Sequence, residues 1–413
     1  MLCGKVWASP ELVPVDGDEM PSVLIGHQSV EPNFTHRMRG TIRFIVRSSM
    51  CFSLKKKLSI RHHLDQQHQS HKVVVNKNQG IRDTPVAKIR GWLPAGFILW
   101  LAFGSPAQLY AKEQIVDFPQ NMDQKRNRNV PIKFHLPKER TAQPVVVISH
   151  GAGGSRDGMF ALAQEIAKQG YVVMCLEHVT SNTDNIRERM KAKRWGFRNA
   201  VVASGKDISA RRNRPLDVKF AIDLATKLNL EDSNLKGRMD LSRIAMIGHS
   251  YGAYTTLVCC GAKPVGIQDQ LADARVKLGI VMSPQAGNGE FFDATSFQAI
   301  KVPFMGISGN RDRTQFVTSV KDREDCFRSM PPGDKHFVWF DDAGHFSFSD
   351  SSGSGRKVLL KPDSDVTNAL KRIVPSILDV HLRGTEKLDA AARNQLVDAS
   401  LAGSVKRIEW KTR

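Results

Sequence analysis

Residues 243–260 read RIAMIGHSYGAYTTLVCC and carry the strongest signal for the fold. The first six residues form a short apolar run typical of a buried strand, and residues 251–262 have the pattern of a helix. Between the two, Ser250 has Gly248 and Gly252 two residues away on either side. Because glycine lacks a Cβ, this spacing allows a sharp, strained turn that holds the serine hydroxyl out from the backbone. The stretch therefore predicts a strand–turn–helix unit that presents Ser250 as a nucleophile.

Strand-like and helix-like segments alternate on both sides of this unit. This alternation implies an α/β protein whose sheet is mostly parallel and doubly wound, with helices on both faces. In such sheets, sites form beyond the carboxyl ends of the strands. An alternating apolar and polar pattern at residues 130–137 predicts a half-exposed edge strand. The other predicted strands are 144–150, 171–178, 243–248, 277–283, 302–309 and 336–342, and the predicted helices are 158–170, 214–228, 251–262 and 365–384.

Two further polar residues follow predicted strands and suit a catalytic triad. A serine hydroxyl needs a neighbouring base, and the base needs a carboxylate that orients it. Asp312, in SGNRDRT, follows the strand at 302–309, and His345, in DDAGHFSF, follows the strand at 336–342. The order serine, aspartate, histidine is the one found with nucleophile turns of this kind. We therefore predict that Ser250, Asp312 and His345 are the catalytic residues.

Other histidines and aspartates compete for these roles. His150 and His178 also follow strands, but they precede the serine in the chain, and His249 within the turn is expected to pack away from the Ser250 hydroxyl. Asp293, Asp341 and Asp342 are alternative carboxylates, and the last two are too close to the base in sequence to approach it from a neighbouring strand.

An oxyanion hole requires two backbone N–H groups aimed at the same point. The residue after the nucleophile, Tyr251, is one expected donor. The glycine-rich loop SHGAGGSRDG, residues 149–158, follows an apolar strand and lets the backbone approach a substrate closely, so Ala152 is the second expected donor. A phosphate-binding loop is the alternative interpretation. However, this loop matches neither GxGxxG nor a glycine-Lys-Ser/Thr motif.

The composition, with 41% hydrophobic and 24% charged residues, is that of a globular protein. The formal net charge of +19 is spread along the chain, which indicates a solvated basic surface or attraction to anionic groups. No zinc-finger or RNA-binding signature is present, so no nucleic-acid partner is expected. The six cysteines form no CxxC pair, and we predict no metal and no cofactor. The cysteines are expected to be buried, with one disulfide involving Cys326 as the alternative.

The first 112 residues differ from the remainder. Residues 1–85 contain a polar His/Gln tract and a basic cluster, and we predict that they are disordered or not part of the mature protein. Histidines in that tract could also ligate a metal weakly. Residues 86–112 combine a positive start, an apolar stretch and small residues, which is typical of a secretory signal, with a membrane anchor or a core helix as alternatives. We expect a later true start of the protein and a location outside the cell or in its envelope.

The remaining residues, 113–413, are predicted to form a single α/β domain. Between residues 180 and 214 lies a long segment rich in Arg and Lys, which leaves the sheet near the expected site. Insertions at such a place often cover a site and select its substrate. We expect a basic lid that favours an anionic or polar ester, or else a solvated basic loop.

Taken in order, VVVISHGAGGSRDG, GHSYGAYT, GNRD and AGHFSF resemble the α/β-hydrolase superfamily, and within it the branch of dienelactone hydrolases and platelet-activating-factor acetylhydrolases. The resemblance covers residues 129–401 and implies Ser250 as nucleophile, His345 as base and Asp312 as acid. Two departures stand out. Dienelactone hydrolases use cysteine as the nucleophile, and in the plasma acetylhydrolases the acid follows the preceding strand, which here ends in VMSPQAG without a carboxylate. The second departure argues against an acetylated phospholipid as the substrate.

The residues and the resemblance together predict a serine hydrolase that cleaves a small-molecule carboxylic ester through an acyl-enzyme. A peptidase or amidase of the same fold is the first alternative, and a binding protein without catalysis is the second. Contact with a membrane is expected only through the segment at 86–112.

Overall fold

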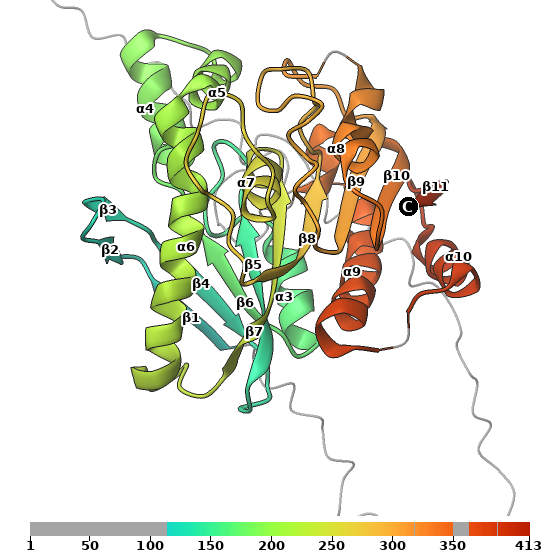
Figure 1. Ribbon diagram of the computed structural model, residues 1–413, viewed down its shortest axis with the longest axis horizontal. Helices are drawn as coiled ribbons and strands as arrows, with labels where there is room; N and C mark the ends of the chain where they lie inside the picture. The colour runs from blue at the N-terminus through green and yellow to red at the C-terminus, as the bar shows by residue number, and fades with distance from the viewer. Residues whose placement is uncertain (1–113, 318, 350–362, 386) are drawn as a thin grey trace, which may run out of the picture. The chain divides into compact units, whose positions relative to one another are not determined.

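The computed structural model describes residues 114–413, apart from residues 318, 350–362 and 386 (Figure 1). Its centre is a nine-stranded sheet in the order β1-β4-β6-β5-β7-β8-β9-β10-β11. The predictions for residues 1–85 and 86–112 lie outside the described residues.

Six neighbouring strands form the parallel part of the sheet, and antiparallel strands extend it at both edges. The predicted α/β class with a mostly parallel sheet is thus confirmed. The parallel strands are β6 (Val172–Leu176), β5 (Gln143–Ser149), β7 (Met239–His249), β8 (Val276–Met282), β9 (Phe304–Arg311) and β10 (Lys335–Gly344). The antiparallel strands are β4 (Ile132–Leu136) and β1 (Gln114–Phe118) on one side and β11 (Ile408–Thr412) on the other, while β2 (Met122–Asp123) and β3 (Arg128–Asn129) form a separate hairpin.

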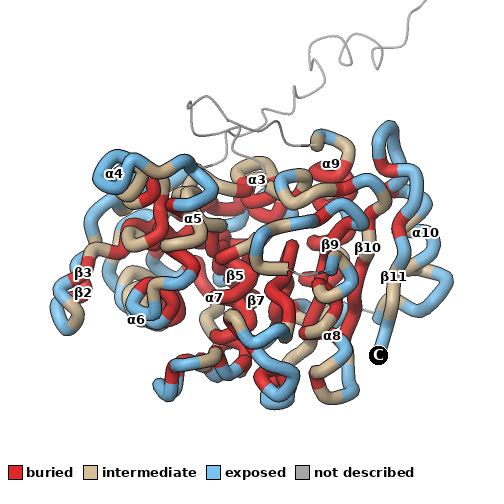
Figure 2. Tube along the Cα trace, turned by 90° about the horizontal axis from the view of Figure 1, so that it is seen from above, coloured by how far each residue is buried: buried red, intermediate tan, exposed pale blue. Residues whose placement is uncertain are grey.

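The apolar runs of the central strands are buried on both sides because helices cover both faces of the sheet (Figure 2). In β5, Val145 and Val147 point to the same core as helices α6 (Ile208–Glu231) and α7 (Tyr251–Cys259). Val146 and Ile148 point to the opposite core, with helices α3 (Phe160–Lys168) and α9 (Ser364–Leu378). Alternate residues of one strand therefore serve two cores, which explains a continuous rather than an alternating apolar pattern.

The prediction of a half-exposed edge strand at residues 130–137 is wrong. The strand there, β4, is the second strand of the sheet, and only Lys133 of its five residues is not buried. The edge position belongs to β1, which pairs with β4 along its whole length. The alternating pattern came from two polar residues, Lys133 and His135. His135 is buried, and Lys133 forms ion pairs with Asp117 of β1 and with Asp157.

The segment at residues 180–214 is largely helical. It forms α4 (Thr183–Lys193), α5 (Phe197–Lys206) and the first residues of α6, all near the carboxyl ends of the parallel strands (Figure 1). Helix α6 begins six residues before the predicted start because Asp207 caps it, accepting a hydrogen bond from the Ala210 N–H. Pro215 lies inside this helix.

The C-terminal part contains the helix predicted at residues 365–384 and, after it, elements that the sequence patterns did not predict. Helix α9 runs through Pro375 and is followed by a π-helical turn, η3 (Asp379–Arg383). Helix α10 (Ala390–Ser400) then leads to β11, which pairs with β10 at the sheet edge. Shorter elements between β9 and α9 are η1 (Val320–Glu324), α8 (Asp325–Ser329) and η2 (His345–Phe348).

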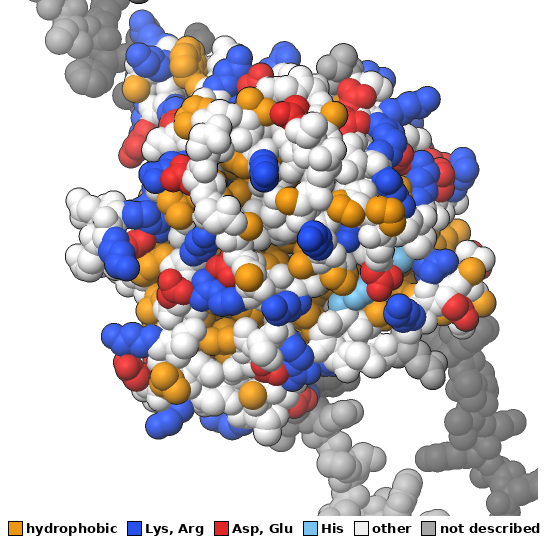
Figure 3. All heavy atoms as spheres, in the orientation of Figure 1, with side chains coloured by type: hydrophobic (Ala, Val, Ile, Leu, Met, Phe, Trp, Pro, Cys, Tyr) orange, Lys and Arg blue, Asp and Glu red, His pale blue; other side chains and the backbone are white. Residues whose placement is uncertain are grey.

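Within the described part of the chain, the four cysteines are buried and Cys326 is in no disulfide, so the alternative of a disulfide involving Cys326 is not realised. Among these same residues, the helices are all too short or too polar to cross a membrane. Lys and Arg side chains are scattered over the face seen in Figure 3 and are interspersed with Asp and Glu.

Candidate active site

Ser250 lies in a tight turn between β7 and α7. Its backbone has φ of 56° and ψ of −116°, a strained conformation for a residue with a side chain. A Cβ on Gly248 would lie 2.1 Å from the carbonyl oxygen of Gly252, and a Cβ on Gly252 would lie 1.9 Å from that of Ser149. Both glycines are therefore required by close backbone approach, as the sequence spacing indicates. The turn leaves Ser250 partly exposed at the carboxyl end of β7.

The structure brings Ser250, His345 and Asp312 into one hydrogen-bonded chain. His345 Nε2 lies 2.9 Å from Ser250 Oγ, and His345 Nδ1 lies 2.8 Å from Asp312 Oδ1. With the proton on Nδ1, the imidazole donates to the carboxylate and accepts from the serine hydroxyl. Asp312 follows the end of β9 and His345 follows the end of β10, so all three side chains come from strand ends at the same edge of the sheet.

Asp312 is completely buried and is surrounded by donors. Ser308 Oγ donates to Asp312 Oδ2 at 2.8 Å, and Arg323 Nη2 donates to Oδ1 at 2.9 Å. Burial alone would raise the pKa of this carboxyl, but the hydrogen bond from His345 and the positive charge of Arg323 hold it well below its usual range. Asp312 is therefore ionised throughout the physiological pH range.

Arg323, from η1, is a neighbour that the sequence analysis missed. Its buried guanidinium also donates to the backbone carbonyl groups of Ser283, Pro284 and Asp312. It thereby joins the loops after β8 and β9 behind the carboxylate. Nothing in the sequence around Arg323 distinguishes this buried arginine from the arginines that lie at the surface.

The competing residues take other positions. His249 lies beside His345, with ring centroids 5.0 Å apart, and its Nε2 donates to the His345 carbonyl oxygen at 2.8 Å. Burial lowers the pKa of His249 to about 3, so this ring stays neutral. Asp293 hydrogen-bonds to residues of its own turn, and Asp341 and Asp342 are not buried.

The two expected oxyanion donors lie next to the nucleophile. Tyr251 is the first residue of α7, where an N–H has no partner within the helix. A Cβ on Gly151 would lie 3.4 Å from Ser250 Cβ, so the loop that carries Ala152 passes directly beside the serine. Among the described residues, no acceptor takes the backbone N–H of Ala152 or of Tyr251. Both N–H groups are thus available to a ligand.

A buried arginine supports this loop from behind. Arg214 of α6 is completely buried, and its Nη2 donates to the His150 carbonyl oxygen and, at 3.1 Å, to Ser149 Oγ. Its Nη1 donates to Ser181 Oγ at 2.6 Å and its Nε to Thr255 Oγ1 at 2.8 Å. Burial lowers the pKa of Arg214 to about 10, so the guanidinium remains charged near neutral pH.

A second buried charged group, Asp217, lies on the same helix as Arg214 and forms its ion pairs with Arg126 and Arg128. Asp217 binds His178 Nδ1 at 3.0 Å and Arg128 Nε at 2.7 Å. Burial alone would raise the pKa of Asp217, but hydrogen bonds from His178 and Arg128 lower it to about 2. Burial and the charge of Arg214 lower the pKa of His178 to about 3. His178 is therefore a neutral bridge from Asp217 to Ser149, whose Oγ lies 2.9 Å from its Nε2.

One group of metal-ligating side chains occurs in the described part of the chain. Asp334, His336 and His381 have ligand atoms within 4.8 Å of one another. Asp334 and His336 lie at the amino end of β10, the end opposite to the candidate active site, and His381 belongs to η3. The indole N–H of Trp410 donates to His336 Nδ1, so the ring proton of His336 is on Nε2. A protonated Nε2 cannot bind a metal ion, and Nδ1 already accepts a hydrogen bond.

Comparisons with known proteins agree with this architecture. Residues 120–195 match the family described as platelet-activating factor acetylhydrolase, isoform II. The chain is 26% identical to a platelet-activating factor acetylhydrolase of Canis lupus familiaris, over 55% of this chain and 54% of the relative. It is 24% identical to cutinase est2 of Thermobifida alba, over 52% of this chain and 56% of the relative. The chain thus spans about half the length of the curated relatives that it matches.

Among solved structures, a ferulic acid esterase from Streptomyces cinnamoneus matches 68% of this chain and 93% of its own, at 18% identity and a TM-score of 0.45. The classification rests on the sheet order and on the sequence similarities. The chain has an α/β-hydrolase fold, and its sequence is similar to those of the platelet-activating factor acetylhydrolases.

Proposed function

We propose that this chain is a carboxylic ester hydrolase in which Ser250, His345 and Asp312 form the catalytic triad. The observation that carries the proposal is the hydrogen-bonded chain from Ser250 Oγ through the imidazole to a buried, ionised carboxylate. Relatives named as an acetylhydrolase and cutinases support an ester as the substrate.

In the first half of the reaction, Ser250 Oγ attacks the ester carbonyl carbon while His345 Nε2 takes the hydroxyl proton. Asp312 holds the Nδ1–H of the ring and stabilises the imidazolium that forms. The bond between the carbonyl carbon and the alcohol oxygen then breaks, and the imidazolium gives its proton to the departing alcohol. The acyl group is left on Ser250.

In the second half, water takes the place of the serine hydroxyl. His345 Nε2 removes a proton from the water, whose oxygen attacks the acyl carbon, and the proton returns to Ser250 Oγ as the carboxylic acid leaves. In both halves, the tetrahedral intermediate carries a negative oxygen. The N–H groups of Ala152 and Tyr251 would donate to this oxygen, which in other enzymes contributes several kcal/mol.

The proposal can be tested with a fluorophosphonate probe, which reacts with activated serines, and with nitrophenyl esters of increasing acyl length. The wild-type protein should be labelled and should hydrolyse at least the short esters. Ser250→Ala should lose both. Asp312→Asn should be less stable, because it leaves the buried Arg323 without its carboxylate, and under conditions in which it is folded it should lose about 10⁴-fold in kcat, because the imidazole takes the wrong tautomer.

These measurements also separate the alternatives. A protein that is neither labelled nor active on any ester would be a binding protein with this fold. Labelling of Ser250 together with cleavage of amides but not esters would indicate a peptidase or amidase. Equal labelling of wild type and Ser250→Ala would exclude Ser250 as the nucleophile.

We also propose that the protein acts outside the cell or in its envelope. The support is the signal-like composition of residues 86–112. N-terminal sequencing of natively expressed protein should find a mature form that begins after this segment, and a mature protein that retains it would contradict a cleaved signal.

A further inference from the structure

Helix α5 contacts both the oxyanion loop and Tyr251, the residue that follows Ser250. At its beginning, the ring of Phe197 packs against the oxyanion loop, where a Cβ on Gly153 would lie 3.2 Å from the ring. Near its end, the carbonyl oxygen of Ser204 accepts a hydrogen bond from Tyr251 Oη at 3.3 Å. The helix therefore reaches from one expected oxyanion donor to the residue that follows the nucleophile. The helix therefore lies beside the candidate active site.

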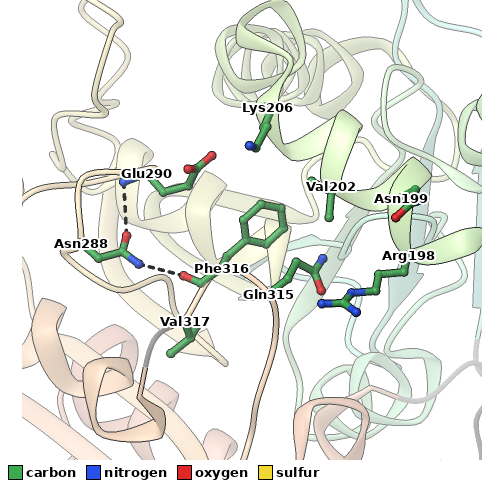
Figure 4. Close-up of a pocket in the computed structure, with 9 residues that line it drawn as sticks. All are labelled: Arg198, Asn199, Val202, Lys206, Asn288, Glu290, Gln315, Phe316 and Val317. Atoms are coloured by element: carbon green, nitrogen blue, oxygen red, sulfur yellow. Dashed lines mark hydrogen bonds between the residues drawn. The ribbon is translucent and has the colours of Figure 1, made fainter.

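A pocket of about 330 Å³ opens beside α5 (Figure 4). Arg198, Val202 and Lys206 line one wall, and their spacing of four residues places them on one face of the helix. The opposite walls come from Asn288–Glu290, in the loop after β8, and from Gln315–Val317, in the loop after β9.

Both of these loops begin at residues that contact the triad. Gln285 Nε2 donates to the Ser250 carbonyl oxygen at 2.8 Å, three residues before Asn288. Asp312 itself begins the other loop, three residues before Gln315. Asn288 Nδ2 donates to the Phe316 carbonyl oxygen at 3.1 Å and joins the two loops (Figure 4). The pocket is thus built on the supports of the active site and lies at the same edge of the sheet.

Some of the charged side chains at this pocket have an ion-pair partner and others do not. Elsewhere in the segment at residues 180–214, Arg189 pairs with Asp207 at 2.7 Å. Glu290, the carboxylate of the pocket, is already held by Arg211, whose guanidinium lies 3.4 Å from Glu290 Oε1. Arg198 and Lys206 form no ion pair with any residue that the structure describes. The pocket therefore offers two cations without carboxylate partners.

We propose that Arg198 and Lys206 form an anion-binding subsite, and that the enzyme prefers esters with a carboxylate on the part that extends past α5. The inference rests on the proposed ester hydrolase activity. An anion in the pocket would pair with cations that are positioned on one helix face, beside the apolar surfaces of Val202 and Phe316. Glu290 would limit the pocket to a singly charged group.

The test compares matched pairs of esters that differ in charge. On the acyl side, the pair is 4-nitrophenyl hydrogen adipate and its neutral methyl ester; on the alcohol side, it is 4-acetoxybenzoate and its methyl ester. For each pair, the ratio of kcat/KM for the anionic over the neutral ester is measured in wild type and in Arg198→Gln/Lys206→Gln. We expect this ratio to fall about fivefold or more in one of the pairs, which identifies the side that enters the pocket.

Lys191→Gln/Lys193→Gln is the matched control, because these two exposed residues remove the same two charges from the segment at residues 180–214 but do not line the pocket. Its ratio should equal that of the wild type. In wild type, high salt should lower the ratio for the same ester pair, since screening weakens an exposed ion pair. Equal ratios for wild type and the double variant in both pairs would overturn the subsite while leaving the esterase proposal intact. Absence of ester hydrolysis and of Ser250 labelling would overturn both.

Discussion

At the scale of single residues, the candidate site depends on two buried guanidinium groups that the sequence does not distinguish. Arg323 forms an ion pair with the Asp312 carboxylate, and Arg214 donates a hydrogen bond to the His150 carbonyl oxygen in the oxyanion loop. Arg323 pairs with a buried carboxylate, whereas the buried charge of Arg214 is held by hydrogen bonds to neutral oxygens. Each of them joins segments that are far apart in the chain.

Replacing Arg214 by lysine should weaken both the fold and the oxyanion loop. Lysine keeps the charge, but one ammonium group cannot reach His150 O, Ser149 Oγ, Ser181 Oγ and Thr255 Oγ1 together. We expect a loss of about 2–4 kcal/mol in the free energy of unfolding, measured with urea. Fluorophosphonate labelling of Ser250 should also become slower under conditions in which the variant is folded.

Arg212→Lys provides the comparison two residues away. Arg212 is exposed and pairs with Asp269 at the surface, so its replacement should change neither stability nor labelling measurably. If the two variants behaved alike, the buried hydrogen bonds of Arg214 would have no special role.

At the scale of elements, the turn between β7 and α7 is the most constrained feature. The strand, the turn and the helix are packed so closely that the backbone of α7 passes within contact of the backbone of β5 at Gly252. The helix itself is entirely buried, which leaves it no direction in which to move. The position of the serine is therefore set by backbone packing.

Gly252→Ala should disrupt this turn. The added methyl group would lie 1.9 Å from the Ser149 carbonyl oxygen, and neither backbone can retreat. We expect loss of Ser250 labelling and a fall in the thermal unfolding temperature. Gly196→Ala, before α5, is the matched control because an added Cβ there meets nothing within 4 Å. An active Gly252→Ala protein with wild-type stability would show that the turn tolerates a Cβ.

At the scale of the whole molecule, buried histidines link stability to pH. Burial lowers the pKa of His178 and of His249 to about 3 and that of His336 to about 4, and it holds the pKa of His150 well below its usual value. In the unfolded chain these groups titrate near pH 6.5. Between pH 6.5 and 4 the unfolded state therefore binds protons that the folded state does not.

Stability should consequently fall as the pH drops below about 6.5. Each neutral histidine contributes about 1.4 kcal/mol per pH unit to this slope, and the measurement is the free energy of unfolding in urea at several pH values. Asp312 and Asp217 do not contribute in this window, because their lowered pKa values place their effect at more acidic pH. His249→Gln can still donate to the His345 carbonyl oxygen, and it should reduce the slope by the contribution of one histidine, about 1.4 kcal/mol per pH unit. Stability that is constant from pH 7 to pH 5 would contradict the assignment of neutral buried histidines.

The sequence alone determined the alternation of strands and helices and the glycine spacing around Ser250. It also placed Asp312 and His345 after strands. These features follow from local sterics and from the period of apolar residues, which are properties of neighbouring residues in the chain. The α/β class and the similarity to platelet-activating factor acetylhydrolases follow from the same patterns.

Only the tertiary structure decided which strands lie at the edges, which arginines are buried and where α5 lies. The edge strands β1 and β11 pair with β4 and β10, and their positions depend on partners that no local pattern identifies. Arg214, Arg323 and Arg198 have the same chemistry, yet the first two are enclosed and the third faces a pocket. The burial of a charged side chain depends on contacts between distant segments, so residue type and spacing do not predict which arginines are buried.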